Sequence, residues 1–207
     1  MRYFKFPKWS RSVYPGAIWD FSFREDHAVY LTFDDGPAPG VTEWILDLLD
    51  DYNAKATFFC LGEKVETSPE LYAQILKSGH VTGNHGMQHL NGLKTGNKDY
   101  LHNVLVAKKL INSTLFRPAY GKLKTSQYKM LREAGFDVVF WSAMAYDFDE
   151  TLSSRKRIAK MKSLTENGAI FVFHDNEKSV RALKTDLPQL MDWWKINKYT
   201  FKSVYIG

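Results

Sequence analysis

Two adjacent aspartates close an apolar run in the first quarter of the chain. The segment LTFDDGPAPG at 31–40 contains Asp34 and Asp35. An Asp-Asp-Gly sequence alone is typical of a turn. Other apolar runs, however, also end in groups that can act as acids, bases or metal ligands. These groups are Asn84 with His85, Arg117, the stretch around Asp147, and His174 with Asp175.

Two histidines, His85 and His89, have the i, i+4 spacing that puts both imidazoles on one face if the segment is helical. Two imidazoles and one carboxylate form a common three-ligand catalytic site for zinc or a similar divalent ion, with one position left open for water. Asp35 stands at the end of another apolar run and can supply the carboxylate. The sequence therefore predicts a divalent metal site at Asp35, His85 and His89.

Short β-rich runs alternate along the chain with segments of helical periodicity. We predict strands at 28–34, 55–61, 80–84, 114–117, 137–142, 169–174 and 201–206. We predict helices at 41–52, 65–78, 97–112, 125–134, 151–166 and 179–197. In the first helix, Ile45, Leu48, Leu49 and Tyr52 are spaced for one helical face. In the second, Ser68 and Pro69 resemble an N-cap and a first-turn proline, and Gly79 stands where a C-cap would.

This alternation implies parallel strands joined by right-handed crossovers, in either an open doubly wound sheet or a barrel. A complete eight-fold barrel typically needs about 250 residues. A chain of 207 residues therefore suggests a shortened, seven-stranded barrel. In either architecture, functional groups gather at the carboxyl ends of the strands, so the polar groups named above should meet on one rim.

Composition and charge limit the kinds of partner. The net charge of +5 favours an anionic partner. The basic residues are spread along the chain rather than gathered into a nucleic-acid motif, so no nucleic-acid partner is predicted. The only cysteine, Cys60, excludes an internal disulfide. A cytoplasmic location is favoured, because no segment has the apolar core of a signal peptide or the roughly 20 apolar residues of a membrane span. Contact of the aromatic and basic N-terminal arm with a membrane surface stays open, as does the oligomeric state.

Five segments, in order, resemble the motifs of a known family. They are TFDDG at 32–36, NHGMQH at 84–89, RPAYG at 117–121, WSAMAYD at 141–147 and IFVFHD at 170–175. The set is similar to the five motifs of polysaccharide deacetylases, carbohydrate esterase family four. The resemblance implies an α/β fold, a distorted (β/α)7 barrel forming a single domain. It places the catalytic domain at 28–207 and makes 1–27 an N-terminal arm packed on the barrel.

The resemblance also implies a set of metal ligands and a base. Asp34 matches the catalytic base, and Asp35, His85 and His89 match the metal ligands. The expected ion is zinc, with cobalt, manganese or nickel as alternatives. Arg117 matches the arginine that holds the base.

The remaining roles concern the leaving group and the oxyanion. His174 matches the general acid, with Asp147 at the position that orients it. The backbone N–H of Tyr120 matches an oxyanion donor. Asp175 is left outside the catalytic set, because it can equally be a strand-end cap.

The chain departs from the family pattern at three positions. Gly86 replaces the usual Ser or Thr after the first histidine, which removes a hydroxyl that braces the ligand loop. Loss of such an outer-shell bond can weaken metal affinity by about 10–100-fold. Phe148 replaces a tryptophan and Val172 a leucine, and both changes should alter pocket shape more than chemistry.

Some candidate side chains also have purely structural interpretations. His80 is predicted to be a structural histidine, and His27 and His102 are predicted to lie on the surface. Trp141 can wall the substrate pocket or belong to an aromatic core, and Phe148 can wall the pocket.

The implied activity is metal-dependent hydrolysis of an N-acetyl group on an amino sugar in a glycan. An O-acetyl esterase, or an amide hydrolase of the same mechanism acting on a non-sugar, remains an alternative. So does a carbohydrate-binding relative without turnover, although binding alone needs none of Asp34, Arg117 and His174. Chitin oligomers, peptidoglycan, other acetylated hexosamine polymers and a lipid-linked sugar all remain open as the acetylated partner.

Overall fold

The structure, a computed structural model, describes residues 4–205. The strands are β1 (Ala28–Asp34), β2 (Thr57–Cys60), β3 (Val81–Asn84), β4 (Leu115–Phe116), β5 (Asp137–Val138), β6 (Ala143–Met144), β7 (Ala169–His174) and β8 (Thr200–Lys202). The helices are α1 (Ser10–Val13), α2 (Thr42–Asp51), α3 (Gly62–Thr67), α4 (Pro69–Lys77), α5 (Asn97–Lys108), α6 (Thr125–Glu133), α7 (Ser154–Ser163) and α8 (Val180–Ile196). Two short 3₁₀ helices are η1 (Gly92–Lys94) and η2 (Ala119–Gly121).

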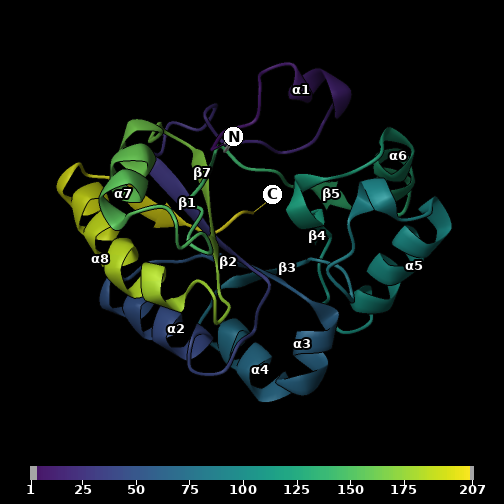
Figure 1. Cartoon of the computed structure of the whole chain (residues 1–207), viewed down its shortest axis with the longest axis horizontal. Coiled ribbons are helices and arrows are strands. Elements are labelled where there is room, and N and C mark those ends of the chain that lie inside the picture. Colours follow the sequence, from purple (N-terminus) through teal and green to yellow (C-terminus); the bar gives the residue numbers. More distant parts are fainter. Residues whose placement is uncertain (1–3, 206–207) are drawn as a thin grey trace.

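The strands form one parallel sheet with the order β5-β4-β3-β2-β1-β7-β6, and β8 pairs with the start of β1. Figure 1 shows the helices in an arc around the strands, from α7 and α8 through α2, α4 and α3 to α5 and α6. The curled sheet with helices outside it confirms the predicted α/β class and distorted barrel.

The central strand β1 is buried along its whole length, as expected for a parallel strand covered on both faces. Because side chains alternate along a strand, Val29, Leu31 and Phe33 pack toward the helices in the largest core cluster. Tyr30 lies on the opposite face, inside the barrel. Asp34 has the same parity as Tyr30, so the alternation directs its carboxylate inward.

The predicted strand at 137–142 is wrong as a single strand. Its first residues form β5 beside β4, and the chain then crosses to β7, where β6 forms one residue beyond the predicted end. Between them, the Phe140 N–H donates to the Ile18 carbonyl at 2.7 Å. The fifth predicted strand is therefore two short strands, joined by buried residues that pair with Ile18 of the N-terminal segment.

The helices differ from the prediction in four places, one of which is the end of α5 at Lys108 instead of residue 112. The predicted helix at 65–78 is two helices, α3 and α4, which meet where Pro69 begins α4. Ser68 occupies the N-cap of α4 without a side-chain cap bond, and Gly79 has the left-handed φ of +76° expected beyond a helix end. Helix α7 is shorter than the predicted 151–166, and α1 was not predicted. Within residues 4–205, no helix combines the length and apolarity needed to cross a bilayer.

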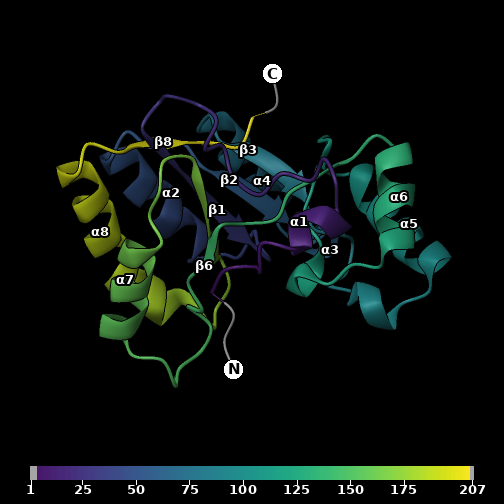
Figure 2. The ribbon, with the colours of Figure 1, turned by 90° about the horizontal axis from the view of Figure 1, so that it is seen from above.

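The N-terminal segment covers the side of the barrel between β5 and β6. The Met144 N–H donates to the Phe4 carbonyl at 2.9 Å, beside β6, and the Ile18 N–H donates to the Val138 carbonyl at 2.9 Å, beside β5. Figure 1 shows α1 across the part of the ring that the other helices leave uncovered, and Figure 2 shows from above how the N-terminal segment runs from beside β6 to α1. The boundary at residue 27 stays a prediction, and residues 1–3 of the predicted arm and residue 206 of the last predicted strand lie outside the described residues.

Candidate active site

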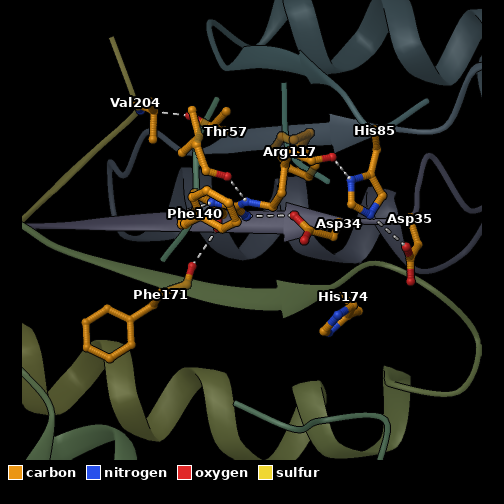
Figure 3. A network of polar contacts seen from close by, with 12 residues as sticks. Asp34, Asp35, Thr57, His85, Arg117, Phe140, Phe171, His174 and Val204 are labelled. Atoms are coloured by element: carbon orange, nitrogen blue, oxygen red, sulfur yellow. Dashed lines mark hydrogen bonds and ion pairs between the residues drawn. The ribbon is translucent and has the colours of Figure 1, made fainter. Parts of the chain in front are cut away.

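The parallel register brings the predicted polar groups to one edge of the sheet. Asp34 at the end of β1 pairs with His174 at the end of β7, and Asn84 at the end of β3 pairs with Phe116, next to Arg117. Figure 3 shows Asp34, Asp35, His85 and Arg117 grouped around the end of β1, with His174 across from them on β7.

Asp34 is paired with a buried guanidinium. Arg117 donates from Nη1 to Asp34 Oδ1 at 2.7 Å, and neither side chain is more than 4% exposed. Arg117 also donates to Thr32 Oγ1 at 2.6 Å and to the Phe140 carbonyl at 3.1 Å (Figure 3). The carboxylate is therefore fixed in orientation and its charge is balanced within the barrel.

Burial lowers the pKa of Arg117 from its ordinary value, and the neighbouring Asp34 carboxylate opposes that shift. The guanidinium lies over the ring of Phe59, with its Cζ 4.0 Å from the ring centroid. The pair thus combines an aromatic face with hydrogen bonds from all three guanidinium nitrogens, which compensate the burial of the charge.

Asp35 points away from Asp34, toward two imidazoles. Its backbone has a φ of +84°, outside the strand region, so the two adjacent carboxylates diverge. Asp35 Oδ1 lies 3.5 Å from His85 Nε2 and 3.4 Å from His89 Nε2. The three potential ligand atoms all lie within 4.8 Å of one another.

Three observations test whether these residues suit a divalent ion. Asp35 Oδ1 is buried and has no hydrogen-bond partner among residues 4–205, so an electropositive partner would satisfy it. Burial alone would raise the pKa of Asp35, but His85, His174 and His89 hold this pKa well below its usual range. The carboxylate is therefore ionised, as a metal ligand must be. His85 Nδ1 lies 2.8 Å from the Arg117 carbonyl, which only accepts, so Nδ1 is the donor there and Nε2 is the ring nitrogen turned toward Asp35. The residues fit the group.

His89 is the third potential metal ligand, and its side chain is more exposed than that of His85. Burial and, to a smaller extent, the neighbouring His85 lower the pKa of His89 to about 4, although Asp35 opposes the shift. The ring is therefore neutral at pH 7, the form that binds a metal. It lies 4.3 Å from the ring of Tyr120, centroid to centroid.

The two histidines do not lie on a helix, so the condition for a shared helical face is not met. Residues 85–91 form a loop, and Gly86 turns it with a φ of +90°. Asn84 Oδ1 accepts from the Gly86 N–H at 2.7 Å, and Asn103 Oδ1 on α5 accepts from the Met87 N–H at 3.1 Å.

Gly86 cannot be exchanged freely for the usual hydroxyl residue. A Cβ at this position would lie 2.6 Å from Asn103 Oδ1 and 3.0 Å from the Gln88 carbonyl. The buried Asn103 amide thus occupies the side of the loop where a side chain at 86 would begin. This brace was missed from the sequence, where Asn103 is one polar residue in a helix.

His174 is held by Asp147 through both carboxylate oxygens. The His174 Nδ1–H donates to Asp147 Oδ1 at 2.7 Å, and the His174 backbone N–H donates to Oδ2 at 2.7 Å. Burial alone would lower the pKa of His174, but Asp147 outweighs it and raises the pKa to about 9. Asp147 therefore keeps the imidazole protonated at pH 7 and leaves Nε2 as the free donor.

Asp175 and Asn176 shape the loop that carries the two aspartates. Asp175 is buried and accepts from the Gly36 N–H and the Thr42 hydroxyl, each at 2.8 Å. A Cβ on Gly36 would lie 1.8 Å from Asp175 Oδ2, so this close approach requires glycine. Asn176 Nδ2 donates to Asp35 Oδ2 at 2.9 Å and orients that carboxylate. Nothing in the sequence marks Asn176 except its position after His174 and Asp175.

The other predicted residues divide between pocket and fold. Tyr120 has a left-handed φ of +59° and an exposed ring beside the pocket, and its role as an oxyanion donor stays a prediction. His80 is buried and accepts from the Ala56 N–H at 3.3 Å, while His27 and His102 are exposed. Trp141 is both a pocket wall and part of an aromatic core, and Phe148 lies against His174 with ring centroids 5.0 Å apart.

A cavity of about 560 Å³ joins these groups. Asp34, Asp35, His85, His89 and His174 all line it. Its walls are mainly aromatic, with Tyr120, Trp141, Tyr146 and Phe148, and its mouth carries the exposed lysines Lys122 and Lys178. A volume of this size suits a sugar-sized ligand.

Comparisons with known proteins agree with this arrangement. A family profile described as polysaccharide deacetylase matches residues 23–139. A peptidoglycan-N-acetylglucosamine deacetylase of Bacillus cereus is 36% identical over 191 residues, covering 87% of this chain and 88% of that protein. The peptidoglycan-N-acetylmuramic acid deacetylase PdaA of Bacillus subtilis is 30% identical over 194 residues, covering 87% and 71%.

The similarity extends to the tertiary structure. The crystal structure of a peptidoglycan N-acetylglucosamine deacetylase superposes with a TM-score of 0.82 at 30% identity, covering 96% of this chain and 95% of that one. Some similar proteins are longer, and the match with the deacetylase PgdA of Listeria monocytogenes spans 39% of that protein. The ordered motifs, the curled parallel sheet and these matches together show that the chain belongs to the polysaccharide deacetylase family.

Proposed function

We propose that the chain hydrolyses the N-acetyl group of an amino sugar in a peptidoglycan-type glycan, with a divalent metal ion held by Asp35, His85 and His89. One observation carries the proposal. A single cavity contains a fitting metal triad, a carboxylate fixed by a buried arginine, and an imidazole kept cationic by a second carboxylate. This combination supplies the ligands, base and acid of amide hydrolysis.

The first half of the reaction needs an activated water. A divalent ion bound by the triad would supply a Lewis acid for the acetamide carbonyl and would acidify the attacking water. Asp34 accepts the water's proton, because Arg117 fixes its carboxylate in the cavity. The Tyr120 backbone N–H is the proposed donor to the oxyanion, and a donor of this kind contributes about 3 kcal/mol.

The second half needs a proton for the departing amine, which is otherwise a very poor leaving group. His174 donates it from Nε2, since Nδ1 is engaged by Asp147. No covalent enzyme intermediate is required. His174 and Asp34 belong to neighbouring strands and are paired in register, so acid and base stand side by side at the cavity floor.

Two features favour a glycan of the peptidoglycan type. The relatives described above are named for N-acetylglucosamine and N-acetylmuramic acid in peptidoglycan. Lys122 and Lys178 stand exposed at the cavity mouth, and neither forms an ion pair within the described part of the chain. Their charge suits a glycan that carries carboxylates, as N-acetylmuramic acid does.

Metal removal and restoration test the proposed reaction. Wild-type protein should release acetate from N-acetylated glycans, lose this activity after chelation and regain it when zinc, cobalt, manganese or nickel is added back. The measurement is acetate release across a panel of N-acetylglucosamine oligomers, peptidoglycan fragments and O-acetylated glycans. Full activity in the chelated protein would contradict the metal site, and turnover of the O-acetylated glycans alone would replace the amidase with an esterase.

The pH dependence tests the roles of His174 and Asp147. Because the pKa of His174 is raised to about 9, kcat/KM should fall as pH rises through about 9. Asp147→Asn removes the dominant favourable charge, so burial should move this alkaline limb to lower pH. The raised pKa of His174 also makes the stability of the fold depend on pH. The charged His174–Asp147 pair stabilises the fold fully below pH 6.5, and this stabilisation is lost as pH rises through about 9. An unchanged alkaline limb in Asp147→Asn would refute the assignment of the acid.

A further inference from the structure

A second cavity adjoins the catalytic one. It has a volume of about 640 Å³. Five residues line both cavities: Tyr120, Lys122, Trp141, Met144 and Tyr146. A ligand seated over the metal triad can therefore extend past Tyr120 into this space without leaving the protein surface.

We call this second cavity the groove. Its far wall is formed by the N-terminal segment, with Phe6, Trp9 and Tyr14. The segment is fixed at several points rather than loosely attached. Phe6 packs against Trp141 with ring centroids 4.8 Å apart, and the Tyr14 hydroxyl donates to the Leu123 carbonyl at 2.6 Å. Together with the backbone bonds beside β5 and β6, these contacts make the wall preformed, which lowers the entropic loss on binding.

Trp9 is the one large aromatic side chain of this wall that is left open. It is 68% exposed, and its ring stacks on no other aromatic ring among residues 4–205. Trp9 lines a cavity whose other walls are mainly aromatic, with Phe6, Tyr14, Tyr120, Trp141 and Tyr146, and ligand sites are typically lined by such side chains. The C–H face of a pyranose ring is apolar and slightly positive, so it packs well on the electron-rich face of an indole.

We propose that this groove binds the sugar unit next to the acetylated one, with Trp9 as its stacking platform. The proposal rests on the deacetylase function proposed above and adds a binding residue outside the five motifs, Trp9, for the neighbouring sugar unit of the glycan. A neighbouring sugar unit is the expected ligand because the groove is continuous with the catalytic cavity and shares part of its wall. Lys122, which lines both, is placed to contact polar groups of either sugar unit.

A lipid surface is the competing occupant, since the same segment carries Lys5, Lys8 and Arg11. Two of these cations are already engaged. Lys5 pairs with Glu166 at 3.4 Å, and Arg11 pairs with Asp20. From residue 4 onward, the segment thus offers one exposed indole and one lysine without an ion pair, less than a stable interfacial anchor requires.

The test compares substrate lengths. Wild-type protein and Trp9→Ala are assayed on the disaccharide and the pentasaccharide of N-acetylglucosamine. The ratio of kcat/KM for the pentasaccharide to that for the disaccharide should fall about 3- to 10-fold in Trp9→Ala, mainly through KM. Trp9→Phe should restore most of the ratio. Phe23→Ala is the matched control, since Phe23 is 75% exposed and lines neither cavity, and it should leave the ratio unchanged.

Each outcome decides between the alternatives. An unchanged ratio in Trp9→Ala overturns the groove proposal, while wild-type acetate release from the disaccharide shows separately whether the proposed function holds. Calorimetry with the pentasaccharide and the turnover-deficient Asp34→Asn protein should show weaker binding when Trp9→Ala is added. Binding of wild-type protein to phosphatidylglycerol vesicles that Trp9→Ala abolishes, together with an unchanged length ratio, would assign the segment to a membrane surface instead.

Discussion

Asp34→Asn should reduce acetate release by about 10²–10⁴-fold, the range that a positioned general base contributes. The amide has nearly the shape of the carboxylate and can still accept from Arg117, so the cavity should keep its form. It cannot take a proton from the attacking water. The decrease should appear in kcat more than in KM, because the base acts on the transition state rather than on substrate binding.

Metal binding separates this loss from damage to the site. Calorimetric titration with zinc should give a similar affinity for Asp34→Asn and wild-type protein, because the proposed ligands are Asp35, His85 and His89. Asp47→Asn, an exposed carboxylate on α2, serves as the matched control and should keep wild-type activity. Full activity in Asp34→Asn would show that another group is the base. Loss of zinc binding would show that Asp34 is itself a ligand.

Arg117→Met should lower the free energy of unfolding by about 3–5 kcal/mol, as expected when one partner of a buried ion pair is removed. Arg117 is completely buried, and its removal leaves Asp34, Thr32 and the Phe140 carbonyl without their donor. Deacetylation should also be lost, because the carboxylate of Asp34 is no longer held. The measurement is urea unfolding followed by circular dichroism.

A second substitution tests the electrostatic explanation. Asp34→Asn in the Arg117→Met background removes the unpaired buried charge, so the double variant should be more stable than Arg117→Met alone. Arg132→Met removes a partly exposed ion pair with Asp137 and should change stability by less than about 1 kcal/mol. If the double variant were no more stable than Arg117→Met, lost packing on Phe59 rather than charge would account for the effect.

The sequence determined those parts of the fold whose cause is local. The bounds of β1 and β7 agree with the predicted 28–34 and 169–174. Both are apolar runs buried along their length, and such runs end where the first charged or imidazole group must be accommodated. The alternation of strands and helices gave the fold class, and the rule for strand ends gave the rim on which Asp34, Arg117 and His174 meet.

The tertiary structure alone decided how the site groups are held. His85 and His89 face Asp35 because a loop braced by Asn103 and turned at Gly86 brings them there, and helical spacing plays no part. Asn176 orients Asp35 from a position 141 residues away along the chain. Each of these contacts joins segments whose own sequences carry no sign of the partner.

The same reason explains why the strand predicted at 137–142 is divided and why a second cavity exists. The segment at 137–142 looks like one strand because residues 138–141 are all apolar, yet its pairing changes at Val139 and Phe140, which lie beside Ile18 of the N-terminal segment. The N-terminal segment reads as an irregular aromatic and basic arm, and only its contacts with β5 and β6 turn it into a wall beside the catalytic cavity. Local pattern thus determined which elements form and where their polar ends lie, while long-range hydrogen bonds and packing decided what those ends face.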